Sequence, residues 1–199
     1  MARIGVLALQ GDYREHIEVF ERLETPAIQV KTRFDLERVD ALVIPGGEST
    51  VISKLLKTFD LFNPVKKAIE LGMPVFGTCA GLIMLSREIL HAASNQESFG
   101  AIDVAVRRNA FGHQVDSFET DLYFEGIEGS IHAAFIRAPI VESYSDSVKV
   151  LSRLADGRIV AVQQGNALGI SFHPEVTAED RVHQYFLQLV DTKLASARE

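Results

Sequence analysis

The stretch Gly77-Thr78-Cys79-Ala80-Gly81 holds the only cysteine of this 199-residue chain and has a glycine two positions to either side of it. The residues before it read as a buried strand and those after it as an apolar helix, so the spacing matches a G-x-S-x-G nucleophile elbow with sulfur in place of oxygen. Glycines are needed there because side chains would collide in so sharp a turn. The turn would present the Cys79 thiol at a helix N-terminus, where the helix dipole favours a thiolate. A buried structural cysteine is an equally good interpretation of these five residues.

A thiol nucleophile needs a base, and the base needs a group that orients it. The candidate is His173 of Phe172-His173-Pro174-Glu175, which follows a predicted strand. Pro174 restricts His173 to an extended conformation. Glu175 would then reach one imidazole nitrogen while the other faces Cys79, as in a Cys-His-Glu triad. Taken alone, a histidine at this position is more typical of a surface or core residue.

Metal and cofactor sites are not predicted. The chain has no CxxC or HExxH spacing that would indicate zinc, and we expect neither a metal nor a cofactor. The remaining histidines have no setting comparable with that of the candidate base; they are His16, His91, His113, His132 and His183.

A glycine-rich turn, PGGEST at 45–50, follows the predicted strand ALVI and begins a helix. A phosphate loop is excluded because no lysine follows the glycines and Glu48 would repel a phosphate. Two interpretations stay open. The segment is either a tight turn with Ser49 as the helix N-cap, or a loop whose Gly46 and Gly47 present N–H groups to a developing oxyanion while Glu48 faces a cationic substrate group.

Composition indicates one globular domain over residues 1–199, because no linker, repeat or low-complexity run divides the chain. Its 20 basic and 27 acidic residues give a formal net charge of −7, which argues against nucleic-acid binding. The apolar runs are too short for a signal peptide or a membrane span. A lone cysteine forms no internal disulfide and suits a reducing compartment, so we expect a cytoplasmic protein without membrane contact.

Strand and helix signals alternate in the first half of the chain, which predicts a parallel sheet covered on both faces. One of these helices is expected at 13–23, with Tyr13, Ile17 and Phe20 on its buried face, and an apolar one at 80–90. From residue 102 the chain reads as strands with short turns, including an ADG hairpin at 155–157, and then as a helix over 178–194. The predicted fold is a three-layer α/β sandwich with a mixed, mostly parallel sheet and an antiparallel extension.

Several motifs, taken together, resemble a known family. GTCAG, FHPE and the Gly-Gly loop are similar to class I, triad-type glutamine amidotransferases. GVLALQG with REH, PGGEST, RNAFG and FIRAP resemble, more narrowly, the glutaminase subunits of pyridoxal 5'-phosphate synthases. The motifs run from Ile4 to Glu175, so the resemblance covers nearly the whole chain. GTCAG alone would identify only the wider class.

The resemblance implies a reaction and a set of roles. Cys79 would attack the side-chain amide of L-glutamine and release ammonia from a glutamyl thioester, His173 would move the protons, and Glu175 would orient His173. Backbone N–H groups of Gly47 and Ala80 would bind the oxyanion. The implied substrate-binding residues are Gly46, Gly47, Glu48, Arg108, Ile136 and Arg137. His113 stands where the family more often has arginine, which leaves any role of that position open.

The resemblance also implies a partner, the synthase (lyase) subunit that makes pyridoxal 5'-phosphate, in a large hetero-oligomer. Gln10 lies at the carboxyl end of a predicted strand, where sites form in such sheets, and is a candidate for the partner interface; an ordinary strand-to-helix turn is the alternative. Two other functions remain open. One is a glutaminase for another synthase, such as the imidazole glycerol phosphate enzyme, and the other is a non-catalytic regulator on the same scaffold.

Overall fold

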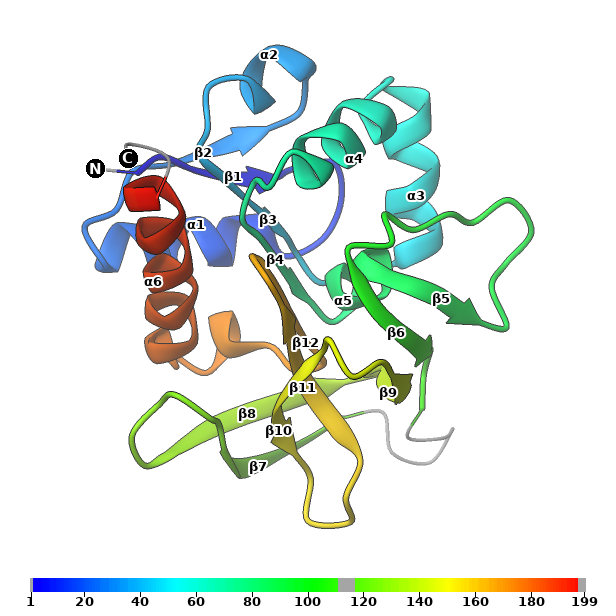
Figure 1. Ribbon diagram of the computed structural model, residues 1–199, viewed down its shortest axis with the longest axis vertical. Helices are drawn as coiled ribbons and strands as arrows, with labels where there is room; N and C mark the ends of the chain where they lie inside the picture. The colour runs from blue at the N-terminus through cyan, green and yellow to red at the C-terminus, as the bar shows by residue number, and fades with distance from the viewer. Residues whose placement is uncertain (1, 111–116, 197–199) are drawn as a thin grey trace.

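A computed structural model describes residues 2–110 and 117–196 of the chain. Its centre is a ten-stranded sheet (Figure 1) in which nine strands follow one another and β10 pairs with β11. The order along the sheet is β2 (Ala27–Val30), β1 (Ile4–Leu7), β3 (Ala41–Ile44), β4 (Val75–Thr78), β12 (Ala167–Ile170), β11 (Ile159–Gln164), β9 (Ile140–Tyr144), β6 (Ile102–Arg107) and β5 (Ser86–Leu90), with β10 at Lys149–Arg153.

The sheet is parallel from β2 through β12 and mostly antiparallel beyond it. Alternate residues of the central strands enter two separate apolar cores: in β3, Leu42 and Ile44 face one core and Ala41 and Val43 the other. This is the pattern expected of a sheet covered on both faces. The predicted three-layer α/β fold with an antiparallel extension is therefore confirmed.

Helices cover the two faces unequally. One core takes side chains from α2 (Arg33–Leu36), α3 (Ser49–Thr58), α4 (Phe62–Glu70) and α5 (Ala80–Leu85). The other core takes side chains from α1 (Tyr13–Arg22), α6 (Asp180–Ser196) and a two-stranded ribbon of β7 (Ser117–Tyr123) and β8 (Ser130–Ile136). Figure 1 shows α1 beside α6 and the ribbon beneath the sheet. Within the described residues, no helix combines the length and apolar character needed to cross a membrane.

Three glycines let α5 approach the sheet closely. A Cβ on Gly81 would lie 2.0 Å from the Ile44 carbonyl oxygen, and one on Gly77 would lie 2.4 Å from the Gly81 carbonyl carbon. On the neighbouring strand, a Cβ on Gly169 would lie 2.6 Å from Leu82 Cδ1. The helix that follows Cys79 can therefore lie over β3, β4 and β12 only because these side chains are absent.

The predicted helix at 80–90 is wrong in its second half. The helix ends at Leu85, where the Ser86 hydroxyl donates to the Ile83 carbonyl, and residues Ser86–Leu90 form β5. β5 pairs in parallel with β6. Arg, Glu and Leu are good helix formers, but pairing with the second edge of β6, whose first edge pairs with β9, outweighs this weak local preference.

The second half contains one strand that the sequence pattern did not predict, β9, which lies between β11 and β6. The ADG hairpin is confirmed: it joins the antiparallel pair β10 and β11, and the Gly157 N–H donates to the Leu154 carbonyl.

The buried face of α1 differs from the prediction. His16, Val19 and Phe20 are buried, whereas Tyr13 and Ile17 are only partly so. A buried histidine also lies on α6, His183. Both histidines are fully enclosed, with no exposed surface.

Candidate active site

The chain turns from β4 into α5 at Cys79. Cys79 has φ 49° and ψ −103°, a region that non-glycine residues rarely occupy and that is typical of strained functional turns. Its side chain is 7% exposed, and Sγ lies 3.8 Å from the Ile136 carbonyl oxygen at the end of β8. Ala80 is the first residue of α5, so its N–H has no acceptor within the helix. The elbow thus presents a thiol beside an N–H that can bind an anion.

His173 and Glu175 follow β12, the strand next to β4 in the sheet. His173 Nδ1 lies 2.7 Å from Glu175 Oε1, and the Glu175 side chain is fully buried behind the ring. The main-chain N–H of His173 donates to the Ala134 carbonyl of β8. After His173 the chain makes a short 3-10 turn, Pro174–Val176, which brings Glu175 back to the ring.

The electrostatic setting of His173 suits a base that takes a proton. Burial by itself lowers the pKa of His173, but hydrogen bonds with Cys79 and Glu175 outweigh burial and raise the pKa to about 10. Burial likewise disfavours the Glu175 carboxylate, yet His16 and the His173 hydrogen bond hold the pKa of Glu175 below its usual value. The Glu175 carboxylate therefore stabilises the protonated form of His173.

The glycine loop between β3 and α3 packs against the residues that follow β1. The Gln10 side-chain carbonyl accepts a hydrogen bond from the Glu48 N–H at 2.8 Å, and the Asp12 N–H donates to the Gly46 carbonyl. Gly47 has φ 151°, and a Cβ there would lie 2.5 Å from Gln10 Oε1. The loop and Gln10 are therefore held together in one close contact.

Gly46 also lies against the candidate base. A Cβ on Gly46 would lie 2.4 Å from His173 Cε1, so any larger side chain would displace the ring. The loop therefore contacts the candidate base.

The prediction that Ser49 is the N-cap of the helix after this loop is wrong. The N-cap of α3 is Glu48, whose carboxylate accepts from the Thr50 N–H, and Ser49 is the first helical residue. The Ser49 hydroxyl instead accepts a hydrogen bond from the Gln96 amide. A carboxylate at the N-cap complements the positive end of the helix dipole.

Arg108 and Glu48 form an ion pair at the rim of the site. Arg108 Nη2 donates to Glu48 Oε1 at 2.7 Å, and Arg108 Nη1 donates to Gln96 Oε1 at 3.1 Å. A cationic and an anionic group thus lie side by side near the thiol. His113, whose role the resemblance leaves open, lies outside the described residues.

These groups surround one cavity of about 560 Å³. Every candidate site residue lines it except Gly46 and Glu175, which lie behind His173. The complete lining is Gln10, Asp12, Gly47, Glu48, Ser49, Cys79, Ala80, Ile83, Arg108, Asn109, Ile136, Arg137 and His173. The structure therefore brings the sequence candidates together, including Ile136 and Arg137 from β8 and the turn after it.

Asp12 lines the cavity and is absent from the sequence candidates. Its Oδ2 lies 3.7 Å from His173 Nδ1, and burial raises the pKa of Asp12 against the opposing effect of His173. The sequence signal was its position in LQGD, directly after a strand at the sheet edge where sites form.

Two buried histidines, His16 and His183, were also missed. The expectation that neither has a setting like that of the base is wrong for His16, since its Nε2 lies 3.7 Å from Glu175 Oε2. Each lies on an amphipathic helix, where sequence alone does not distinguish an enclosed histidine from a half-exposed one.

Asp12, His173 and Glu175 each offer a metal-ligating atom within 4.8 Å of the others. However, His173 Nδ1 and Glu175 Oε1 are 2.7 Å apart, whereas two ligands at tetrahedral zinc lie about 3.3 Å apart. The His173–Glu175 spacing is therefore that of a hydrogen-bonded pair and is too short for two ligands of one zinc ion.

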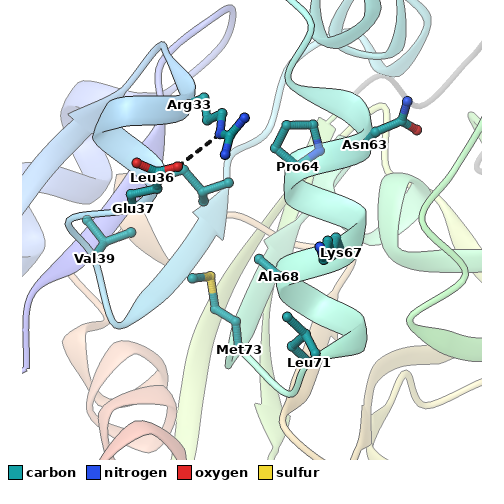
Figure 2. Close-up of a pocket in the computed structure, with 10 residues that line it drawn as sticks. All are labelled: Arg33, Leu36, Glu37, Val39, Asn63, Pro64, Lys67, Ala68, Leu71 and Met73. Atoms are coloured by element: carbon teal, nitrogen blue, oxygen red, sulfur yellow. Dashed lines mark hydrogen bonds and ion pairs between the residues drawn. The ribbon is translucent and has the colours of Figure 1, made fainter.

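A second cavity of about 530 Å³ lies between α2 and α4 (Figure 2). Its polar side chains are Arg33 and Glu37, which pair with each other at 2.9 Å, together with Lys67 and Asn63. The lining contains no thiol or imidazole, so this cavity lacks the combination of Cys and His that lines the first one.

Comparisons with known proteins agree with the geometry. A family model described as the SNO glutamine amidotransferase family matches residues 6–192. A protein named pyridoxal 5'-phosphate synthase subunit PdxT from Leifsonia xyli subsp. xyli is 55% identical over 186 residues, covering 93% of this chain and 94% of that protein. Another of the same name from a Parafrankia species is 51% identical over 197 residues, covering 98% and 97%.

Solved structures resemble the chain as well. One described as a glutamine amidotransferase has a TM-score of 0.89 and 48% identity, and the match covers 94% of this chain and 98% of that one. A putative GMP synthase protein from Thermoplasma acidophilum has a TM-score of 0.72 at 17% identity, with coverage of 100% and 98%. The second likeness concerns the fold alone.

Proposed function

Because this chain belongs to the SNO glutamine amidotransferase family, we propose that it is the glutaminase subunit of a pyridoxal 5'-phosphate synthase. It hydrolyses L-glutamine to L-glutamate and ammonia, and the ammonia passes to the synthase (lyase) subunit. The whole chain, residues 1–199, acts as one glutaminase domain. The free thiol of Cys79 is compatible with a cytoplasmic setting.

A single observation carries the catalytic part of this proposal. Cys79 lies at the strained turn between β4 and α5 and lines one cavity with His173, and His173 Nδ1 lies 2.7 Å from Glu175 Oε1 behind it. Interactions with Cys79 and Glu175 both raise the pKa of His173. A nucleophile, a base and an orienting carboxylate in this order are the constellation of a Cys-His-Glu triad. A non-catalytic regulator on this scaffold has no need of all three groups.

The reaction proceeds in two stages. His173, with a pKa of about 10, already holds the proton of the Cys79 thiol, and the thiolate attacks the side-chain amide carbon of glutamine. His173 returns that proton to the amide nitrogen, the carbon–nitrogen bond breaks, and ammonia leaves a glutamyl thioester. Water, deprotonated by His173, then attacks the thioester carbonyl; glutamate leaves the Cys79 thiolate, and His173 keeps the proton that it took from the water. The N–H groups of Gly47 and Ala80 bind the oxyanion in both stages.

The Arg108–Glu48 pair provides the groups that hold the rest of the substrate. A guanidinium binds an α-carboxylate in a bidentate manner, and a carboxylate binds an α-ammonium group. Because the two side chains already contact each other, a glutamine molecule binds by exchanging one ion pair for two. Ile136 and Arg137 complete the pocket around the side-chain amide, and Gly46 supports it from behind His173.

The test is glutamate release from glutamine by the wild-type chain and by Cys79→Ser, in the presence of the synthase subunit. We expect Cys79→Ser to fold normally and to lose glutaminase activity, because a hydroxyl has a far higher pKa than a thiol. Labelling by a glutamine-analogue diazoketone, followed by intact mass, should add one label to the wild type and none to the variant.

Two further variants test the roles of the base and its partner. His173→Asn should be as severe as Cys79→Ser. Glu175→Gln should be milder, at a loss on the order of a hundredfold, because it removes orientation and charge but leaves the base. Near wild-type turnover in Cys79→Ser would refute the nucleophile, and a larger loss in Glu175→Gln than in His173→Asn would reverse the two roles.

A further inference from the structure

A buried polar cluster lies behind the triad, on the side away from the substrate cavity. It consists of His16 from α1, His183 from α6, Thr78 at the end of β4, and the second carboxylate oxygen of Glu175. His16 Nδ1 lies 2.8 Å from His183 Nε2, and His16 Nε2 lies 3.1 Å from Thr78 Oγ1. His16 Nε2 also lies 3.7 Å from Glu175 Oε2. We call these four residues the rear cluster.

The surroundings of the rear cluster keep both histidines neutral. Phe76 packs edge-on against both imidazole rings, and Phe20 packs edge-on against His183. Burial in this apolar setting lowers the pKa of His16 and lowers that of His183 well below its usual value. Each ring therefore carries one N–H, and its second nitrogen is an acceptor.

Glu175 decides which nitrogen of His16 carries the hydrogen. Glu175 Oε2 has no hydrogen-bond partner among the described residues, and His16 Nε2 is the ring nitrogen that faces it. A bare nitrogen lone pair opposite a carboxylate is repulsive, whereas an N–H there stabilises the charge. His16 therefore carries its hydrogen on Nε2, and its Nδ1 accepts from His183 Nε2–H.

The second ring nitrogen of His183 supports this direction of hydrogen-bond donation. His183 Nδ1 has no hydrogen-bond partner in the described part of the chain. With the hydrogen on His183 Nε2, the orphaned atom is a lone pair and not an N–H donor, and a buried unpaired donor is the rarer case. Donation thus runs from His183 to His16 and from His16 toward Thr78 and Glu175.

We propose that His16 is a positioning residue for the triad: its Nε2–H, fixed by His183, holds the Glu175 carboxylate and ties it to the β4 end that carries Cys79. The inference rests on the proposed glutaminase function, which it deepens. His16 acts through Glu175 and is not among the residues that line the substrate cavity, so its loss should lower kcat and leave KM nearly unchanged.

The first test measures tautomers and needs no activity. Ring ¹⁵N NMR of the full-length protein, assigned with His16→Gln and His183→Gln, should show His16 and His183 as neutral rings with the hydrogen on Nε2 between pH 6 and 8. A hydrogen on His16 Nδ1, or a protonated His16 ring in that range, would overturn the proposal even in an inactive preparation.

The second test compares matched substitutions in the complete glutaminase and synthase assay. His16→Phe keeps an aromatic ring but removes the N–H, and we expect kcat to fall by about tenfold with KM within about twofold, since small misplacements of catalytic groups cost this much. His16→Gln restores an N–H at the Nε2 position and should recover most of the loss. His183→Phe should lower kcat to a smaller extent.

The pH dependence of kcat/KM would not change if His16 had a purely structural role, so it tests the proposal. The titratable and charged groups around the cluster are His173 and Asp12 beside Glu175, Glu15 beside His16, and Arg22 near His183. Removing the His16 N–H raises the pKa of Glu175, so the acidic limb of kcat/KM in His16→Phe should move to higher pH.

The outcomes separate this inference from the function on which it rests. An inactive wild type would refute the glutaminase function, while an active wild type with unchanged kcat and pH profile in His16→Phe would refute only the role of His16. If His16→Phe does not fold, judged by circular dichroism, the NMR tautomers and His183→Phe decide: an unaltered kcat in folded His183→Phe contradicts the proposal.

Discussion

At the scale of single residues, the site depends on one imidazole that keeps its proton. His173 is nearly enclosed, which would ordinarily make it neutral, yet Cys79 and Glu175 raise its pKa to about 10. The two anionic or potentially anionic neighbours thus decide the protonation state against burial. In the proposed mechanism these same three groups act as nucleophile, base and orienting carboxylate, so the resting electrostatics and the proposed chemistry have a common origin.

This shift predicts how stability depends on pH. The folded-state pKa of His173, about 10, exceeds the value of about 6.5 in an unfolded chain. The stabilisation is therefore fully present below about pH 6.5 and is lost as the pH rises through about 10. Urea unfolding should show wild type to be more stable than Glu175→Gln by the largest margin near pH 6, and the margin should shrink by pH 10.

The control for this prediction is Glu179→Gln, which removes a carboxylate that pairs with Arg181 away from the cavity. Its stability difference from wild type should vary little over the same interval, because arginine keeps its charge throughout. A margin for Glu175→Gln that grows toward alkaline pH would have the wrong sign and would contradict the assignment of His173 as protonated.

At the scale of elements, the elbow depends on how closely α5 lies on the sheet. A Cβ on Gly81 would lie 2.0 Å from a main-chain oxygen, that of Ile44, which no side-chain rotation can relieve. Gly81→Ala should therefore displace α5, cost about 3 kcal/mol or more, and lower glutaminase activity by moving the Ala80 N–H. Urea unfolding and glutamate release measure the two effects.

Gly157→Ala serves as the matched control. Gly157 has φ 89°, but a Cβ there meets no atom within 4 Å, so only backbone strain of about 1 kcal/mol is added. Its activity should stay at the wild-type level. Equal losses of activity in the two variants would show that the close approach of α5 does not govern the elbow.

Local patterns predicted the elements that carry the nucleophile and the base. The glycine spacing around Cys79 and the proline after His173 are constraints between neighbouring residues, and both can be read without knowing the rest of the chain. The strand β5 could not be predicted in this way, because its residues favour a helix and only pairing with β6 makes them extended.

The rear cluster, too, could not be predicted from local sequence patterns. His16 and His183 are 167 residues apart in sequence and meet only because α1 and α6 lie on the same face of the sheet. Asp12 likewise becomes part of the site through contact of its loop with Gly46. Contacts between distant segments decide these roles, and a single sequence contains no periodic signal for them.

At the scale of the whole molecule, the glycine loop and the residues after β1 link the site to the surface from which a partner could act. Gln10 Oε1 accepts from the Glu48 N–H and lies against Gly47. An oxyanion donor contributes only when it is already aimed, and glycine peptides reorient at little steric cost. Docking of the synthase subunit near Gln10 would set the orientation of this loop.

We therefore predict weak glutaminase activity from the chain alone and a marked rise when the synthase subunit is added. Glutamate release with and without the partner measures the effect. Pyridoxal 5'-phosphate formation from ammonium salts should persist with Cys79→Ser in the complex, because only the nitrogen source has been removed. Equal glutamate release in both conditions would show that docking of the synthase subunit does not activate the loop. Failure of ammonium to support product formation would show that this chain does more than supply ammonia to the synthase subunit.

The position of β12 has a consequence for the protein during its synthesis. This late strand inserts between β4 and β11, so β4 remains an unpaired edge until residues 167–170 have left the ribosome. His173 and Glu175 emerge directly afterwards. A nascent chain thus carries Cys79 before His173 and Glu175 have been added, and the proposed nucleophile and base come together only as β12 inserts between β4 and β11.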